Sequence, residues 1–384
     1  MTRELREIFE QAGCEGALCV RPVQGDGEIV LDADRPAVQA SVFKVQIALE
    51  VETAFADGRL DGRERVTLGA AERTDGPVGM SLFEDETVLS LRDLVVLMLT
   101  ISDNPATDVL LGRVGVDALN ATAARLGLSG TLVTSDLRTM LDTIGEDLGR
   151  ADWADLQSWA AGASAADQVW VDEQLPTVRA MDPSRGTRTT PRDMVALLRL
   201  IWTDRAGPAA ACARVRGAMA RQLTRHRIGS GFRPPVRVAA KSGSLSAWSA
   251  TRSAWSPSPT AASTRPRSSP APGPARTTPR SAGPSAPPPP GPSPPCGMWG
   301  VEAGSGGRHH LEQVAGRVGE VEAAGAQRVV GAAVVGRGRV VPVRGAGGAQ
   351  PGEDAVEGGR VHVERQVVAG RVGDGEEVPA SAWS

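Results

Sequence analysis

The amino-acid composition of this 384-residue chain changes abruptly near residue 247, and this change limits what the chain can fold into. Residues 1–246 mix Leu, Ile, Val, Met and Phe with charged residues at helical and strand spacing, as a domain with a buried core requires. Residues 247–384 contain one leucine, Leu311, and no Ile, Phe, Asn or Lys, and 15 of the chain's 28 prolines lie within residues 257–295. The sequence therefore predicts one globular domain over residues 1–246 and a different kind of segment over residues 247–384.

Two interpretations of residues 247–384 are open. A segment so poor in large apolar side chains cannot bury enough surface to offset the entropy of ordering, which predicts a disordered Pro/Gly/Arg/Val-rich C-terminal tail. Alternatively, the segment is out of frame. Tryptophan has a single codon, and residues 248–256 read one nucleotide earlier are compatible with valines around Arg-Asn-Glu. In both cases we expect the valines of residues 327–345 to form no more than a short, marginal hairpin.

Turn and capping signals within residues 1–246 predict strands near both ends and helices between them. We expect a short helix over residues 3–12, strands over residues 16–23, 28–34 and 236–244, and a helix over residues 42–57. Further helix starts are predicted at Ser90 with Asp93, at Asn104 with Pro105, and at Thr190 with Pro191. This order indicates an α/β protein in which a helical subdomain is inserted into a sheet subdomain.

Charge and patterning exclude several classes of partner. The net charge of −3 and the pI near 5.9 do not favour binding to nucleic acid or to an anionic membrane. The first residues are charged and amphipathic, without an apolar leader, and no apolar run reaches the length of a membrane helix. The four cysteines show neither a CxxC pair nor metal-ligand spacing. We therefore expect a soluble, cytoplasmic protein that binds neither nucleic acid nor a membrane and uses no metal and no cofactor.

The first candidate site is the string Ser41-Val42-Phe43-Lys44 at the start of a predicted helix. Residues three apart share a helix face, so the Lys44 amine can reach the Ser41 hydroxyl. A serine hydroxyl is a weak nucleophile until a base takes its proton, and burial lowers the pKa of a lysine and frees its amine. The pattern suits Ser41 as nucleophile and Lys44 as its base, but taken alone it is more typical of a helix-capping serine and a solvated lysine.

A second triplet, Ser102-Asp103-Asn104, is predicted to lie in a loop between two helices. Ser102 could relay a proton to a leaving nitrogen, and Asn104 could hold a substrate amide. Asp103 is expected to support the loop rather than to react. The alternative is that Asn104 simply caps the helix that begins at Pro105.

A third triplet, Lys241-Ser242-Gly243, ends an apolar strand. A lysine and a hydroxyl at this place suit a substrate carboxylate, and a glycine allows a ligand to approach the backbone closely. The alternative is a strand end with a solvated lysine.

Together, S-x-x-K, S-D-N and K-S-G in this order resemble the motifs of the serine β-lactamase and penicillin-binding-protein superfamily, most closely class A-like serine hydrolases. The resemblance covers roughly residues 1–246. It implies a β-lactamase/transpeptidase-like fold with an antiparallel sheet. It also implies an acyl-enzyme on Ser41, and an oxyanion hole made by the backbone N–H groups of Ser41 and Ser244. If residues 247–384 are out of frame, the sheet is incomplete because two strands and a closing helix are missing.

The resemblance fails in the segment between S-D-N and the Thr190 helix start. Class A β-lactamases carry an E-P-E-L-N-type loop there, whose glutamate activates the deacylating water, and this chain has no such string. Glu146, Asp136 and Glu173 are possible substitutes. Three functions therefore stay open: a serine hydrolase acting on β-lactams or related amides and esters, a penicillin-binding-like module without efficient deacylation, and an inactive frameshifted product.

Overall fold

The computed structural model describes residues 2–11, 14–224, 237–245, 329–339 and 361–371. The segment in which an out-of-frame message was inferred, residues 248–256, lies outside the described residues, and so does most of the predicted C-terminal tail. Along the parts of the chain that are described, none of the helices combines the length and the apolar character that crossing a bilayer requires.

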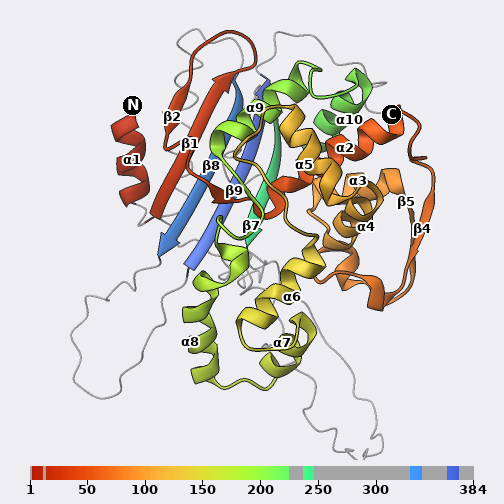
Figure 1. Cartoon of the computed structure of the whole chain (residues 1–384), viewed down its shortest axis with the longest axis vertical. Helices are drawn as coiled ribbons and strands as arrows, with labels where there is room; N and C mark the ends of the chain where they lie inside the picture. Colours follow the sequence, from red (N-terminus) through yellow and green to blue (C-terminus); the bar gives the residue numbers. More distant parts are fainter. Residues whose placement is uncertain (1, 12–13, 225–236, 246–328, 340–360, 372–384) are drawn as a thin grey trace, which may run out of the picture. The chain divides into compact units, whose positions relative to one another are not determined.

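A five-stranded antiparallel sheet with the strand order β2-β1-β8-β9-β7 forms one part of the fold (Figure 1). Its strands are β1 (Cys14–Pro22), β2 (Ile29–Leu31), β7 (Arg237–Leu245), β8 (Val329–Arg339) and β9 (Val361–Arg371). The register pairs Cys19 of β1 with Ala333 of β8, and Lys241 of β7 with Val367 of β9. Strands from the two ends of the chain therefore share one hydrogen-bonded ladder.

The two central strands differ from the sequence-based expectation. An incomplete sheet was expected, with at most a local hairpin near residues 327–345, but β8 and β9 fill the space between β1 and β7. β8 pairs with β1 on one side and with β9 on the other, rather than folding back within its own segment. Valine-rich segments have high strand propensity, and the facing edges of β1 and β7 would otherwise leave rows of backbone groups without partners.

Three helices pack against the sheet. α1 (Thr2–Gln11) lies along β1 and β2, α9 (Pro191–Trp202) crosses β1 and β8, and α10 (Ala209–Ala220) packs against β7 (Figure 1). The ring of Phe9 in α1 sits directly over Gly16 of β1, where a Cβ atom would lie 2.3 Å from it. A glycine in β1 therefore lets α1 approach the sheet closely.

The inserted helical region surrounds α2 (Lys44–Ala56), almost all of which is buried. α2 packs against α10 and against three helices of the insertion, α3 (Leu91–Thr100), α4 (Asn104–Val114) and α5 (Val116–Arg125). Together these helices enclose the main apolar core. This element order confirms the predicted α/β class with a helical insertion in an antiparallel sheet.

A second, smaller core lies among α6 (Leu137–Asp147), α7 (Trp153–Ala160) and α8 (Ala165–Gln174), and Ile144, Leu148 and Trp153 belong to it. This is the segment in which the sequence departs from the class A pattern. The short elements of the chain are β3 (Ala37–Val38), β4 (Arg65–Leu68), β5 (Thr87–Ser90), β6 (Arg188–Thr189), η1 (Ala40–Phe43), η2 (Ala70–Glu72), η3 (Gly79–Leu82), η4 (Leu175–Thr177) and η5 (Arg179–Met181).

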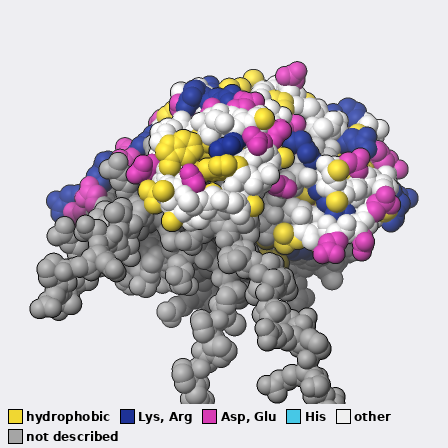
Figure 2. Space-filling view, turned by 90° about the horizontal axis from the view of Figure 1, so that it is seen from below, with side chains coloured by type: hydrophobic (Ala, Val, Ile, Leu, Met, Phe, Trp, Pro, Cys, Tyr) yellow, Lys and Arg dark blue, Asp and Glu magenta, His cyan; other side chains and the backbone are white. Residues whose placement is uncertain are grey.

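The predicted helix starts are confirmed at two of three places. Ser90 accepts the Asp93 N–H at the start of α3, and Thr190 accepts the Asp193 N–H at the start of α9. The third start is displaced by one residue, because the cap of α4 is Asp103 rather than Asn104. On the face drawn in Figure 2, basic and acidic side chains are interspersed, in keeping with the nearly balanced net charge.

Candidate active site

Ser41 lies in η1, the turn of 3₁₀ helix that leads directly into α2. The residue before it, Ala40, has a φ of +45°, a left-handed conformation that a residue with a Cβ atom adopts at an energetic cost. Ser41 is half-buried, and Lys44, one turn later at the start of α2, has no exposed surface. The sequence thus folds into a strained turn that presents the serine and an enclosed amine from the same short segment.

The Lys44 amine holds the Ser102 loop. Its Nζ donates to the Ser102 carbonyl at 2.7 Å, to Ser102 Oγ at 3.1 Å and to Asn104 Oδ1 at 2.8 Å. These contacts join residues 58 and 60 positions apart in the sequence. The S-x-x-K and S-D-N motifs therefore meet in the structure.

Burial changes the protonation of this amine. Desolvation lowers the pKa of Lys44 to about 7, while the carboxylates of Asp108 and Asp103 act in the opposite direction. A lysine with a pKa near 7 is neutral in a large fraction of molecules at neutral pH, which is the state that a general base requires. Lys44 is therefore a buried amine and not the solvated lysine of the alternative interpretation.

The Ser102 loop is held by Asp103, which is fully buried. Its carboxylate accepts the Ala106 N–H at the start of α4 and the Met80 N–H from η3. Gly79, at φ +73°, leaves room for it, since a Cβ atom there would lie 2.0 Å from Asp103 Oδ2. Ser102 itself has a φ of +66°, so the loop holds the backbone of this serine in a strained, left-handed conformation. These contacts agree with the expectation that Asp103 supports the loop.

A second lysine reaches the same hydroxyl from the sheet. Lys241 of β7 has no exposed surface, and its Nζ donates to Ser102 Oγ at 3.0 Å and to the Ser242 carbonyl at 2.6 Å. The Ser242 hydroxyl accepts from Gln222 Nε2 at 2.7 Å. Ser102 is therefore the residue on which both lysines converge.

Gly243 brings β7 against the turn that carries the serine. A Cβ atom at this position would lie 3.0 Å from Val42 Cγ1 and 3.2 Å from both the Gln39 carbonyl and the Val42 nitrogen. The glycine thus permits a close approach of η1, whereas the expected approach of a ligand to its backbone stays a prediction. Ser244 follows on β7, in register with Glu364 of β9.

Lys44 and Lys241 are the only lysines in a chain with 42 lysine and arginine residues. All the other cationic side chains are arginines, whose guanidinium does not lose its proton near neutral pH. Both lysines are wholly buried, and both donate to Ser102. The presence of two lysines among 42 basic residues is therefore a sequence signal for this site that lies outside the three motifs.

Asn104 is engaged at both ends of its amide. Its Oδ1 accepts from Lys44, and its Nδ2 donates to the Asp75 carbonyl at 2.7 Å. The expected role of Asn104 in holding a substrate amide stays a prediction.

Asp108 was missed by the sequence analysis. It lies one turn after Asn104 on α4, and its carboxylate accepts from Thr74 Oγ1 at 2.6 Å and from the N–H groups of Leu137 and Arg138 at the start of α6. Burial raises the pKa of Asp108 above its ordinary value. Its i,i+4 spacing from Asn104 is a signal, but nothing in the sequence indicates that it would hold another helix.

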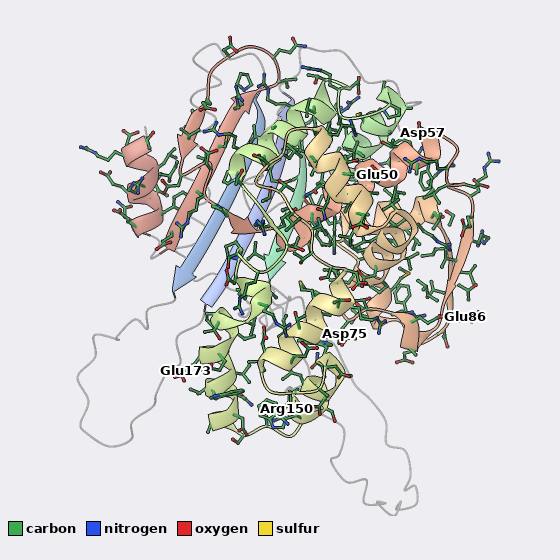
Figure 3. All side chains as sticks on the ribbon, viewed as in Figure 1. Glu50, Asp57, Asp75, Glu86, Arg150 and Glu173 are labelled. Carbon is green, nitrogen blue, oxygen red and sulfur yellow. The ribbon has the colours of Figure 1, made fainter. Side chains whose placement is uncertain are left out.

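Of the carboxylates suggested as substitutes for the missing glutamate, two have structural contacts. Glu146 pairs with Arg179 at 2.5 Å, and Asp136 caps α6 through the Thr139 N–H. The third, Glu173, is an exposed residue of α8 (Figure 3). The geometry thus singles out none of them as the base of a deacylating water.

Comparison with known proteins gives the following relatives. The sequence model described as "Beta-lactamase enzyme family" matches residues 1–252. The "Beta-lactamase regulatory protein BlaB" of Streptomyces cacaoi is 28% identical over 244 residues, which cover 60% of this chain and 76% of that protein. The solved β-lactamase of Sphaerobacter thermophilus is 22% identical with a TM-score of 0.49, over 64% of this chain and 78% of that one. The solved PBP-A is 14% identical with a TM-score of 0.49, over 96% and 86% of the two chains.

Proposed function

The chain belongs to the Beta-lactamase enzyme family, and we propose that it is a serine hydrolase that forms an acyl-enzyme on Ser41 with β-lactam or related amide or ester substrates. The observation that carries this proposal is the convergence of the two buried lysines on Ser102 Oγ, beside the turn that presents Ser41.

In the proposed reaction, Lys44 first loses a proton to solvent, and with it one of the three hydrogen bonds that it donates as an ammonium. The lone pair of the neutral amine then takes the proton of Ser41, and Ser41 Oγ attacks the acyl carbonyl carbon. The backbone N–H groups of Ser41 and Ser244 stabilise the negative charge that develops on the carbonyl oxygen. As the bond from carbon to the leaving nitrogen or oxygen breaks, the proton passes from Lys44 through Ser102 to the leaving atom. The products of this step are the Ser41 ester and a protonated leaving group.

The hydrogen bonds around Ser102 support its role as proton relay. A hydroxyl has two acceptor lone pairs and one proton to donate. With Lys44 and Lys241 both donating to Ser102 Oγ, its own proton is available to a leaving atom. Lys241 and Ser242, in the middle of β7 rather than at its end, would hold a substrate carboxylate, because ammonium and hydroxyl groups form charge-assisted hydrogen bonds with it. Asn104 would hold a substrate amide.

A second candidate is a penicillin-binding-like module that is acylated and deacylates slowly. The observation that favours it is the arrangement of the α6–α8 region, where Glu146 and Asp136 are engaged in holding helices. The curated relative from Streptomyces cacaoi is named as a regulatory protein, which suits a module that senses a β-lactam without destroying it.

The test is covalent labelling of the full chain with a fluorescent penicillin. We expect Ser41→Ala to abolish labelling and Ser184→Ala, in a loop held by Asp182, to leave it unchanged. The rate at which label is lost then separates the candidates, because a hydrolase releases it and a binding module retains it. Labelling that survives Ser41→Ala contradicts both.

A further inference from the structure

Asp75 connects the α6–α8 region to the candidate active site through two different groups. Its backbone carbonyl accepts from Asn104 Nδ2 at 2.7 Å, and its carboxylate Oδ2 accepts from the indole Nε1 of Trp153 at 2.6 Å. Since Asn104 Oδ1 accepts from Lys44, an unbroken path runs from the indole through Asp75 and Asn104 to the proposed base. Figure 3 labels Asp75 in the part of the molecule near α6.

Trp153 is fixed by its own surroundings rather than by Asp75. It is the first residue of α7, its side chain is buried, and it belongs to the second core with Ile144, Leu148 and Leu156. The indole N–H is therefore a donor held at a defined place by the packing of α6 and α7.

The residues immediately before and after Asp75 both contact α4. Thr74 Oγ1 donates to Asp108, which in turn accepts the first N–H groups of α6. Gly76 lies against the Asn104 amide so closely that a Cβ atom there would be 2.9 Å from Asn104 Nδ2. A small displacement of residues 74–76 would therefore shift the Asn104 side chain.

The orientation of the Asn104 amide matters because its two ends differ. The oxygen accepts and the nitrogen only donates, so a reversed amide would direct donors at the Lys44 ammonium. The Asp75 carbonyl selects the orientation in which Oδ1 points to Lys44, and it does so only while residues 74–76 stay in place.

We infer that Trp153 and Asp75 are positioning residues that orient the Asn104 amide toward Lys44, so that the α6–α8 region helps to set the rate of acylation of Ser41. This inference rests on the proposed function. It assigns a role to the segment that carries a glutamate-bearing loop in class A β-lactamases and that differs in this chain.

The experiment compares two tryptophans of the same helix in the full chain. Trp153→Phe removes the indole N–H and keeps an aromatic ring, and Trp159→Phe is the matched control, since Trp159 lies on α7 over Arg150. At Asp75, Asp75→Ala removes the acceptor, and Asp75→Asn keeps an oxygen that can accept the indole N–H. The measured quantity is the second-order rate of labelling by a fluorescent penicillin.

We expect Trp153→Phe and Asp75→Ala each to slow acylation about tenfold, because small misplacements of a positioning group are costly. Trp159→Phe and Asp75→Asn should stay within about twofold of the unsubstituted chain. The double variant Trp153→Phe/Asp75→Ala should be no slower than the slower single variant, since both break one path. Equal rates for Trp153→Phe and Trp159→Phe, or multiplied losses in the double variant, overturn the inference.

A second measurement separates this inference from the proposed function. Because the chain has two lysines, protein made with isotope-labelled lysine gives two lysine side-chain signals in the NMR spectrum. The signal that disappears in Lys44→Arg belongs to Lys44. We expect this signal to shift in Trp153→Phe and to stay in place in Trp159→Phe. A signal unchanged in both variants overturns the inference. If the unsubstituted chain is not labelled by penicillin at all, the proposed acylation fails, and the NMR signal alone decides whether the path positions Lys44.

Discussion

The two sides of the candidate active site are built from different parts of the chain. The helical side, with Ser41, Lys44 and the Ser102 loop, comes from residues 40–108 and lies on the main apolar core. The sheet side, with Lys241 and Gly243, comes from β7, an outermost strand of the sheet whose ladder partner is β9.

This difference shows which interactions each side depends on. The Ser102 loop is fastened by buried side chains, such as the Asp103 carboxylate that holds both α4 and η3. β7 is held by its contacts with η1 and α10 and by a backbone ladder to residues more than 100 positions later. Conditions that disturb the last third of the chain should therefore displace Lys241 before they displace Lys44.

The largest effect is expected from a proline in the centre of β9. Val367 pairs with Lys241 of β7 on one side and with Ala333 of β8 on the other. Val367→Pro removes a backbone donor from a central strand and should destabilise the fold by at least about 1–3 kcal/mol, which is what a buried backbone group costs when it loses its partner. Val361→Pro, at the first residue of β9, is the matched control, because proline is tolerated at the start of a strand.

Thermal unfolding and penicillin labelling of the two proline variants measure this effect. We expect a lower unfolding midpoint and slower labelling for Val367→Pro than for Val361→Pro. Equal midpoints would show that β9 does not hold the sheet side of the site.

The next effect tests the helical side. Lys44→Ala removes the proposed base, and general-base catalysis contributes about 10²–10⁴-fold, so acylation should slow by that factor. It also removes a donor from the Ser102 carbonyl and from Asn104, at a cost to stability of about 1–3 kcal/mol. Stopped-flow labelling measures the first and denaturant unfolding the second. An acylation rate within about threefold of the unsubstituted chain would mean that Lys44 is not the base.

Much of the helical side could be predicted from the sequence, and the reason is local. Ser41 and Lys44 share a helix start, and the caps at Ser90 and Thr190 are short-range hydrogen bonds that a spacing of three residues reveals. The displaced cap at Asp103 shows the limit, since neighbouring Asp and Asn residues both cap helices well.

The parts that could not be predicted depend on distant pairing. Neither the role of Asp108 at the start of α6 nor the bond from Trp153 to Asp75 leaves a periodic or spaced pattern. β8 and β9 were missed because composition reports the side chains that a strand can bury, whereas their place in the sheet is set by ladders to β1 and β7. The sequence composition thus indicates how much apolar surface a segment can bury. The place of a strand in the sheet depends on backbone hydrogen bonds, which only the structure shows.

A smaller effect concerns pH. Burial lowers the pKa of Lys44 to about 7, so the neutral amine is lost as the pH falls below that value. We expect the acylation rate to be constant well above pH 7 and to fall about tenfold for each pH unit below it. The Lys44 NMR signal should titrate with the same midpoint.

Asp108 provides the matched variant for the pH profile. Its negative charge favours the ammonium form and raises the pKa of Lys44, so Asp108→Asn should move the acid limb to lower pH. If the fall in the acylation rate moves to higher pH in Asp108→Asn, Lys44 is not the titrating base. The same holds if the midpoint of this fall differs from the titration midpoint of the Lys44 NMR signal.

The smallest effect is expected on the sheet side, from Lys241→Ala. If Lys241 anchors a substrate carboxylate, its loss should slow acylation by a carboxylate-bearing β-lactam about tenfold more than acylation by a neutral ester with the same acyl group. One hydrogen bond to a charged group is worth about 1.5–3 kcal/mol, and about 1.4 kcal/mol corresponds to a tenfold change in rate.

Both substrates should also slow to a common extent, because Lys241 donates to Ser102 Oγ and its removal leaves Lys44 as the one lysine there. The ratio of the two rates therefore isolates the carboxylate contact from the shared effect on the proton relay. An equal loss on both substrates would assign Lys241 to Ser102 alone, and the two sides of the site would then differ in position but not in role.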